Sequence, residues 1–432
     1  MKIGVISLGC AKNLVDTEYL LGLLKEAGMT LTREPSEAEA IIINTCGFIE
    51  SAKTEAIDTI LECADYKEAT CKKFIVMGCL SQRYQKDLVE EMPEVERFIA
   101  IDEYGQLGTI LSEVLGVKIP NTYGKSTRML SDKPWMGYIK IADGCDNKCS
   151  YCAIPLIRGP YRSMDMDALV EEAKRLADCG VKELNLIAQD TTRFGTDTYK
   201  KRMLPELLKR MNEIEGLHWI RVLYMYPDEI DDELIDGIKD LKKVLPYFDI
   251  PVQHGSDRML KLMNRRGSIE SIRTICERIK RGYDRPVLRT TLITGFPSET
   301  LWDHQLTLEM MKEIQWDRLG AFTYSKEEDT PSFEMEDDVP EEEKVRRLNE
   351  IMDLQKEIAQ AKAASLVGET LEVLVEGYNG LIERYTGRSI YSAPDGVDGE
   401  VIFSSNQVLN QGDFVRVKIK RTRGHDLIGE MI

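Results

Sequence analysis

The stretch Gly137-Tyr-Ile-Lys-Ile-Ala142-Asp-Gly-Cys145-Asp-Asn-Lys-Cys149-Ser-Tyr-Cys152 joins an apolar, strand-like run to three closely spaced cysteines. Three thiolates on one short loop can ligate one metal centre. The spacing lacks the second cysteine pair or histidine pair that is typical of structural zinc sites. A 4Fe-4S cluster normally takes four cysteines, so three ligands would leave one iron open to a small molecule. We therefore interpret this loop as a metal site with a free coordination position.

The region around this loop shows a regular alternation of strand-like and helical segments. With the run at 137–142, the strand-like segments lie near residues 183–188, 219–224, 248–252, 287–294 and 319–324. Such alternation indicates parallel strands covered by helices. Six units predict a central partial (βα)6, TIM-like barrel over residues 135–366, whose working face is the carboxyl end of its strands. The last helix is expected from about Glu341 to Leu366.

The flanking regions predict two further domains, so the chain is expected to be an α/β multidomain protein. Residues 1–120 alternate between apolar runs and helical segments, which predicts a doubly wound parallel sheet with helices on both faces. The weakly patterned residues 121–134 are expected to form a linker. From 367 to 432 the pattern has period two, with turn signals that separate about five strands. This C-terminal region is predicted to form a small antiparallel β-barrel.

A second group of cysteines is dispersed along the N-terminal region. Cys10, Cys46 and Cys79 each follow a predicted strand, and each has a glycine beside it. The carboxyl ends of parallel strands lie along one edge of a sheet, where ligands usually bind. The glycines would let the backbone approach a bulky cluster closely. From spacing alone, a second metal site and three buried structural cysteines remain equally open. The other cysteines, Cys63, Cys71, Cys179 and Cys276, are interpreted as small apolar residues.

Composition excludes some classes of protein. The chain has 432 residues with 57 Lys and Arg against 74 Asp and Glu, a net charge of −17. Binding of nucleic acid through a bulk positive field is therefore not expected. No apolar run approaches the roughly 20 residues that span a bilayer, so a membrane protein is not expected. Ten cysteines in an acidic chain without a signal sequence predict a reducing, cytoplasmic location.

Several motifs are similar to those of one known family. The segments Ser7–Glu18, Asn44–Ala52 and Met77–Tyr84 resemble the N-terminal domain of the methylthiotransferases, a family of radical S-adenosylmethionine (SAM) enzymes. The stretch from Ile141 to Ser163 resembles the radical SAM core of the same family. Residues 367–432 resemble a TRAM domain in length and pattern only. Ser298 departs from the glycine that the family often has at that position.

The resemblance implies two 4Fe-4S clusters and SAM as cofactors. Cys145, Cys149 and Cys152 would hold the cluster that binds SAM, and the other triad, Cys10, Cys46 and Cys79, would hold the cluster that delivers sulfur. One SAM would donate a methyl group, and a second would be the source of a 5′-deoxyadenosyl radical. From their positions at or near strand ends, or beside the cysteines, we expect SAM contacts from Tyr151, Gln189, Asp190, Gln253, Arg289 and Gly295. Arg158 and Arg162 are interpreted either as partners of the SAM carboxylate or as surface ion pairs.

The family has two branches with different substrates. The residues after Cys10, Ala-Lys-Asn-Leu-Val-Asp, are similar to the branch that methylthiolates the β-carbon of an aspartate in a small-subunit ribosomal protein, the twelfth. The alternative branch modifies an adenosine of tRNA. Residues 361–432 contain eight Lys or Arg and ten Asp or Glu, which favours a cationic protein over RNA as partner. We expect the ribosomal protein, free or in the ribosome, and an electron donor such as flavodoxin or ferredoxin as partners, and neither tRNA nor a membrane. The alternative from another class is an iron–sulfur electron carrier or redox sensor.

Overall fold

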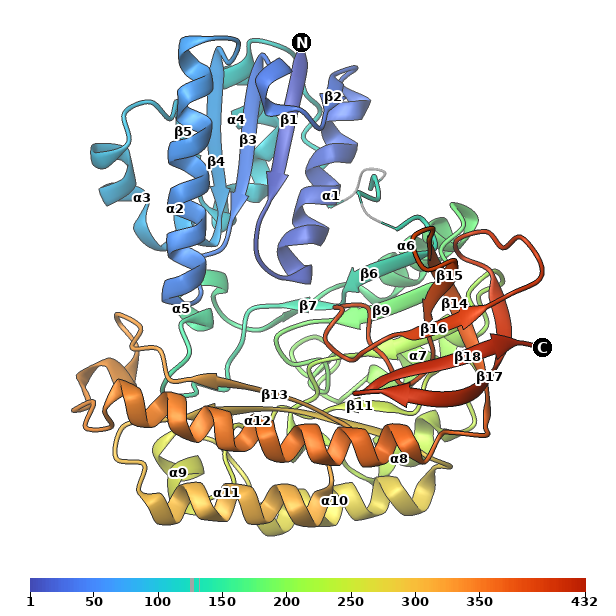
Figure 1. Cartoon of the computed structure of the whole chain (residues 1–432). Coiled ribbons are helices and arrows are strands. Elements are labelled where there is room, and N and C mark those ends of the chain that lie inside the picture. Colours follow the sequence, from blue (N-terminus) through green and yellow to red (C-terminus); the bar gives the residue numbers. More distant parts are fainter. Residues whose placement is uncertain (125–127, 132) are drawn as a thin grey trace.

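The N-terminal region forms a five-stranded parallel sheet with helices on both faces (Figure 1). The computed structural model describes residues 1–124, 128–131 and 133–432. The strand order is β2-β1-β3-β4-β5, with bounds β1 Lys2–Ser7, β2 Thr30–Thr32, β3 Ala40–Thr45, β4 Lys73–Gly78 and β5 Arg97–Ile99. The helices are α1 Ala11–Glu26, α2 Glu50–Ala64, α3 Cys79–Glu91 and α4 Leu107–Leu115. The predicted doubly wound sheet is confirmed.

Each face of this sheet has its own apolar core. Side chains of α1 and α4 pack with one face, and side chains of α2 and α3 pack with the other. Every residue of the central strand β3 is buried, which suits its run of three isoleucines. Part of the predicted linker, residues 125–127 and 132, lies outside the described residues.

The central region is an open half-barrel of six parallel strands. The sheets β10-β9-β6 and β11-β12-β13 are joined by a backbone bridge between Ile220 and Val244. The strands are β6 Met136–Lys140, β9 Glu183–Ile187, β10 Trp219–Val222, β11 Tyr247–Asp249, β12 Val287–Thr294 and β13 Arg318–Thr323. The convex face packs on helices α6 Met166–Asp178, α7 Leu204–Asn212, α8 Asp232–Lys239, α10 Ile269–Gly282 and α11 Leu301–Ile314, with α12 Glu341–Ala364 beside β13. The predicted partial barrel is confirmed.

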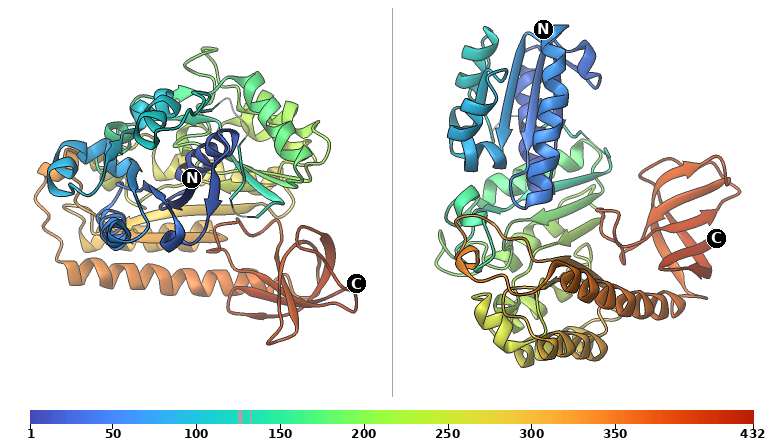
Figure 2. Two further views of the ribbon diagram at one scale, coloured as in Figure 1. Left: turned by 90° about the horizontal axis from the view of Figure 1, so that it is seen from above. Right: turned by 60° about the vertical axis from the view of Figure 1, so that its left-hand side comes forward.

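The concave face of the half-barrel is filled from two directions. Val15 and Tyr19 of α1 pack on it from the N-terminal domain, and Ile390, Tyr391 and Ala393 pack on it from the C-terminal domain. Figure 1 shows the N-terminal sheet above the half-barrel and the C-terminal strands at its side, and Figure 2 shows the same arrangement from two other directions. The carboxyl ends of both sets of strands therefore meet across one interface.

The C-terminal region is a closed five-stranded barrel, as predicted. Its order is β14-β15-β16-β18-β17, with bounds β14 Thr370–Asn379, β15 Arg384–Arg388, β16 Val401–Ser404, β17 Phe414–Arg423 and β18 Asp426–Met431. Four of the pairings are antiparallel, whereas β16 and β18 run parallel. Buried Arg388 pairs with Glu183 of the half-barrel, which fixes the two domains together. Within the described residues, no helix is both long and apolar enough to span a bilayer.

Candidate active site

The structure brings Cys10, Cys46 and Cys79 together at the carboxyl edge of the N-terminal sheet. They follow β1, β3 and β4 respectively, as the sequence predicts. A side chain at Gly9 would lie 2.8 Å from the Cβ and 3.2 Å from the Sγ of Cys46. Glycine at this position therefore lets the backbone pass close to the Cys46 side chain, and its φ of +88° also favours glycine.

Asn13 ties the turns that carry these cysteines. Its Nδ2 donates to the carbonyl of Leu8 at 3.1 Å and to the carbonyl of Thr45 at 2.9 Å. Its Oδ1 accepts from the Cys79 thiol at 3.4 Å. One buried side chain thus connects all three strand ends, and it was missed at the sequence level although it stands three residues after Cys10.

Two thiols of this group, Cys46 and Cys79, are buried, whereas Cys10 is exposed. Burial raises the pKa of Cys79 to about 12, although the Arg158 guanidinium opposes the shift. Burial also raises the pKa of Cys46. Because thiolates are the form that binds metal, loading this group releases protons. Arg158 Nη2 lies 3.7 Å from the Cys79 sulfur and would stabilise its thiolate.

The second group lies on the loop after β7, Ala142–Asp143, at the mouth of the half-barrel. Gly144 has φ +74°, and a side chain there would collide with the backbone of Pro160. Burial raises the pKa of Cys145 to about 11 and raises that of Cys152 further. Arg265 places its Nη1 3.6 Å from the Cys149 sulfur, so each cysteine group has one buried arginine against a sulfur.

Both groups suit an iron–sulfur cluster in their donors and in the cations beside them. Among the described residues, no three His, Cys, Asp or Glu side chains meet closely enough to hold a single metal ion. A cubane cluster makes a different demand, because each cysteine binds its own iron and the sulfurs stand apart. Three thiols, an adjacent guanidinium and the close backbone approach at Gly9 meet that demand at the N-terminal group. The Cys145 loop offers the same donors and the same kind of cation.

Three of the six predicted SAM contacts lie around the Cys145 loop. Tyr151 packs edge-on against Phe296 and its hydroxyl lies 3.4 Å from Arg265. Asp190 accepts from Asn147 at 2.8 Å, and burial raises its pKa. Gln189 lies beside Asp143, and its buried Oε1 has no hydrogen-bond partner among the described residues. Such an orphaned acceptor suits a ligand that carries a donor.

The other three predicted SAM contacts lie on or after strands β11 and β12. Gln253 follows β11, is buried and has φ +76°. Arg289 is the third residue of β12, near the amino end of the strand, and its guanidinium pairs with Asp395 of the C-terminal domain at 2.5 Å. Gly295 donates to Glu299, and a side chain there would collide with Lys344. For Arg289 and Gly295 the observed contacts are within the protein, and their contact with SAM stays a prediction.

A buried ionic network joins the two cysteine groups. Arg158, at the end of α5 Ile154–Arg158, pairs with Asp16 of α1 at 3.0 Å and with Asp143 at 3.1 Å. Lys140 pairs with the same two carboxylates at 2.7 and 2.9 Å. Burial would raise the pKa of Asp143, but Lys140 and Arg158 outweigh it and lower the pKa. Arg158 is only 4% exposed, so its interpretation as a surface ion pair is wrong.

Lys12 is a second residue that sequence reasoning missed. It lies in the first turn of α1 and is 7% exposed. Its ammonium stands 3.2 Å from the ring centroid of Tyr224, which follows β10 at the barrel mouth. Burial lowers the pKa of Lys12 to about 8, although the nearby Cys10 opposes the shift. The side chain therefore crosses from the N-terminal domain to the half-barrel beside Cys10.

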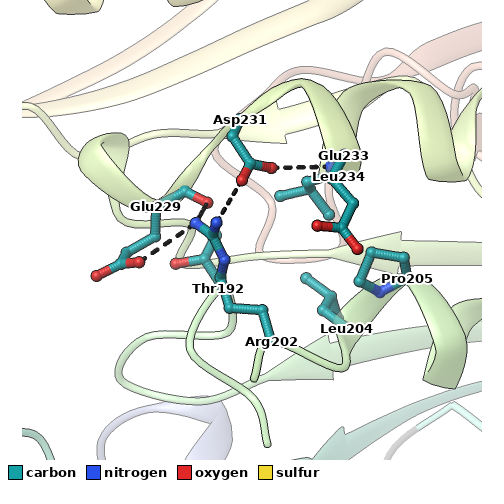
Figure 3. Close-up of a pocket in the computed structure, with 8 residues that line it drawn as sticks. All are labelled: Thr192, Arg202, Leu204, Pro205, Glu229, Asp231, Glu233 and Leu234. Carbon is teal, nitrogen blue, oxygen red and sulfur yellow. Dashed lines mark hydrogen bonds and ion pairs between the residues drawn. The ribbon is translucent and has the colours of Figure 1, made fainter. Parts of the chain in front are cut away.

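A separate small hollow lies beside the half-barrel, lined by Thr192, Leu204 and Pro205 among others (Figure 3). Figure 3 shows Arg202 paired with Glu229 and Asp231 inside it. The hollow offers about 10 Å³, which is room for one water molecule. It is too small for a substrate and contains none of the cysteines.

Comparison with known proteins places the fold and the cysteine loop in one class. Residues 2–100 match the Uncharacterized protein family UPF0004, residues 139–311 the radical SAM superfamily and residues 367–432 the TRAM domain. A similar solved structure is the radical S-adenosylmethionine methyltransferase TsrM from Kitasatospora setae, determined with cobalamin and a 4Fe-4S cluster bound. Its TM-score is 0.56 at 12% identity, covering 77% of this chain and 73% of that chain. The chain is a radical SAM enzyme.

Curated relatives narrow this class to one family. The ribosomal protein uS12 methylthiotransferase RimO of Acetivibrio thermocellus is 46% identical and covers 100% of this chain and 98% of its own. The RimO protein of Lachnoclostridium phytofermentans is 46% identical over 99% of each chain. The chain belongs to the RimO family of methylthiotransferases. The resemblance predicted from the motifs around Cys10, Cys46 and Cys145 is thereby confirmed.

Proposed function

We propose that this enzyme attaches a methylthio group to the β-carbon of an aspartate in ribosomal protein uS12. The family relationship supports the substrate. The observation that carries the proposal is the meeting of two three-cysteine groups across one interface, with Arg158 bonded to the N-terminal group and to Asp143 beside the other. An aspartate β-hydrogen is unactivated, so a cofactor must supply the difficult chemistry while the protein orients the substrate.

Six cysteines would hold the cofactors. Cys145, Cys149 and Cys152 would bind the 4Fe-4S cluster that chelates SAM, and Cys10, Cys46 and Cys79 would bind the cluster that delivers sulfur. When bound, these groups supply a 5′-deoxyadenosyl radical on one side and a methylated sulfur on the other, at the expense of two SAM molecules.

The chain's own residues bind and orient these groups. Arg158 and Arg265 stabilise thiolates at one sulfur of each group. Tyr151, Gln189, Asp190 and Gln253 surround the SAM position, with Gln189 offering its orphaned oxygen. Arg289 and Gly295 complete the proposed SAM contacts at the next strand.

The proposed partners follow from this chemistry. The substrate is the ribosomal protein, either free or within the small subunit, and an electron donor such as flavodoxin or ferredoxin would reduce the SAM-binding cluster. A cytoplasmic location fits a ribosomal substrate. No tRNA substrate is proposed, since the C-terminal domain carries more acidic than basic residues.

The test is product analysis with reconstituted enzyme. Anaerobic incubation with SAM, dithionite and small ribosomal subunits should add one methylthio group to an aspartate of uS12, located by mass spectrometry. Cys10→Ala should still form 5′-deoxyadenosine but insert no sulfur. Modified tRNA beside an unmodified ribosomal protein would overturn the substrate. An absence of 5′-deoxyadenosine from the wild type would instead favour an electron carrier or redox sensor.

A further inference from the structure

Lys12 differs from the other cations at the interface between the two domains. Arg158 and Lys140 each pair with two buried carboxylates. The Lys12 ammonium has neither an ion pair nor a hydrogen bond among residues 1–124, 128–131 and 133–432, and its one close contact is the Tyr224 ring. A largely buried ammonium without a paired anion is costly, so this position favours the binding of an anion.

The position of Lys12 restricts which anion this can be. The ammonium interacts electrostatically with Cys10, with Asp143 of β7 and with Asp249 at the end of β11. It therefore stands between the N-terminal cysteine group and the barrel mouth. Asp143 is already neutralised by Lys140 and Arg158. A carboxylate brought in by the substrate would meet Lys12 at the place where sulfur and radical chemistry must converge.

Tyr224 fixes the far side of this position. Its φ is +60°, an uncommon conformation for a bulky residue. The backbone there is held by Asp249, which accepts from the Tyr224 N–H at 2.9 Å, and by Thr191, which donates to the Tyr224 carbonyl. The backbone that carries the ring is thus held in place, and the ammonium makes a cation–π contact with the ring. This contact orients Lys12 before any substrate arrives.

We propose that Lys12 is the residue that recognises the side-chain carboxylate of the substrate aspartate, and so selects aspartate over asparagine. This inference rests on the proposed function. A charge-assisted hydrogen bond of this kind corresponds to a preference of about 10- to 100-fold for aspartate. The carboxylate would be held by one end while its β-carbon stays free to react.

The experiment measures binding of the ribosomal protein with aspartate or asparagine at the modified position, free and in small subunits, to full-length reconstituted enzyme. The wild type should prefer aspartate by about 10- to 100-fold. Lys12→Met should bind both forms as weakly as the wild type binds the asparagine form, and Lys12→Arg should restore part of the preference. Lys25→Met, at an exposed position of the same helix, is the matched control and should behave as the wild type. Iron content of each variant verifies that the cysteine groups are loaded.

Two results would overturn the assignment. The first is an unchanged aspartate preference in Lys12→Met. If that variant also had a shifted cluster reduction potential, the role of Lys12 would be to balance the charge of the cluster. The second is equal binding of the aspartate and asparagine forms to the wild type, a result that needs no variant. Failure of the wild type to bind or modify either form would refute the proposed function itself.

Discussion

Replacing Arg158 by methionine removes the cation that joins the N-terminal domain to the barrel mouth. The guanidinium pairs with Asp16 and Asp143 at 3.0 and 3.1 Å and donates to Asn13 at 2.6 Å, all in buried surroundings. Without it, Lys140 is the single cation that pairs with these two buried carboxylates among the residues that the structure describes. Removing one partner of a buried ion pair typically costs about 3–5 kcal/mol.

That cost appears in the opening equilibrium of α1, which carries Asp16. Every 1.36 kcal/mol changes an equilibrium tenfold, so the amides of α1 should exchange with deuterium roughly two to four powers of ten faster in the variant. Hydrogen-exchange mass spectrometry measures this directly. Arg162→Met is the matched control, because Arg162 is exposed and only four residues away.

If Arg158→Met changes α1 exchange less than about threefold, which is within the range of an ordinary surface substitution, the ionic network does not hold α1 in place. It also fails if Arg162→Met has the same effect, since loss of any nearby positive charge would then be sufficient.

Glu183→Gln removes the carboxylate that pairs with Arg388, so limited proteolysis should release the C-terminal barrel at least about tenfold faster than in the wild type; an unchanged rate would show that apolar packing alone fixes the domain. The same ion pair predicts that the protein loses stability at low pH. Burial would raise the pKa of Glu183, but two arginines lower it, so its stabilisation is full above the unfolded pKa of about 4.3 and is lost as the pH falls through the lower folded pKa. Below about pH 4, the melting temperature of Glu183→Gln should therefore decrease less with falling pH than that of the wild type. Gly9→Ala places a methyl group 2.8 Å from the Cβ of Cys46 and should reduce the iron bound at the N-terminal group by at least about half, measured as iron per protein. Gly28→Ala is the control for backbone strain alone, because Gly28 also has a positive φ (+74°) but no atom within 4 Å of an added Cβ.

Much of the fold could be predicted because its strands are buried on both faces. The runs at 40–43 and 287–294 are continuous or nearly continuous in apolar and β-branched residues, which is the pattern of parallel strands. The edge strands β2 and β5 were not predicted, because three residues such as Thr30–Thr32 give no periodic signal.

The convergence of Cys10, Cys46 and Cys79 was predictable from topology, since strand ends in a parallel sheet share one edge. The contacts between domains were not. Nothing in the sequence shows that Arg158 lies against Asp16, 142 residues earlier in the chain. Lys12 has no local pattern either, because its partner ring at Tyr224 is set by the docking of two domains.

The distribution of the barrel-strand residues shows the same limit. Gln189 and Asp190 were predicted from their strand-end positions to contact SAM, and the structure places them beside Asp143 and Asn147, next to the cysteine loop. Arg289 was predicted from the same strand pattern, yet its charge is taken up by Asp395 from a domain that begins about 80 residues later. Whether a polar residue faces a ligand or another domain depends on what covers the concave face.

Iron and sulfide quantitation with Mössbauer spectra, on the wild type and on each triple Cys→Ala variant, tests the two-cluster assignment most directly. The wild type should hold about eight irons, and each triple variant should keep about four as an intact 4Fe-4S cluster. A wild type with about four irons that all disappear with Cys145, Cys149 and Cys152, and are unaffected by loss of Cys10, Cys46 and Cys79, would contradict it.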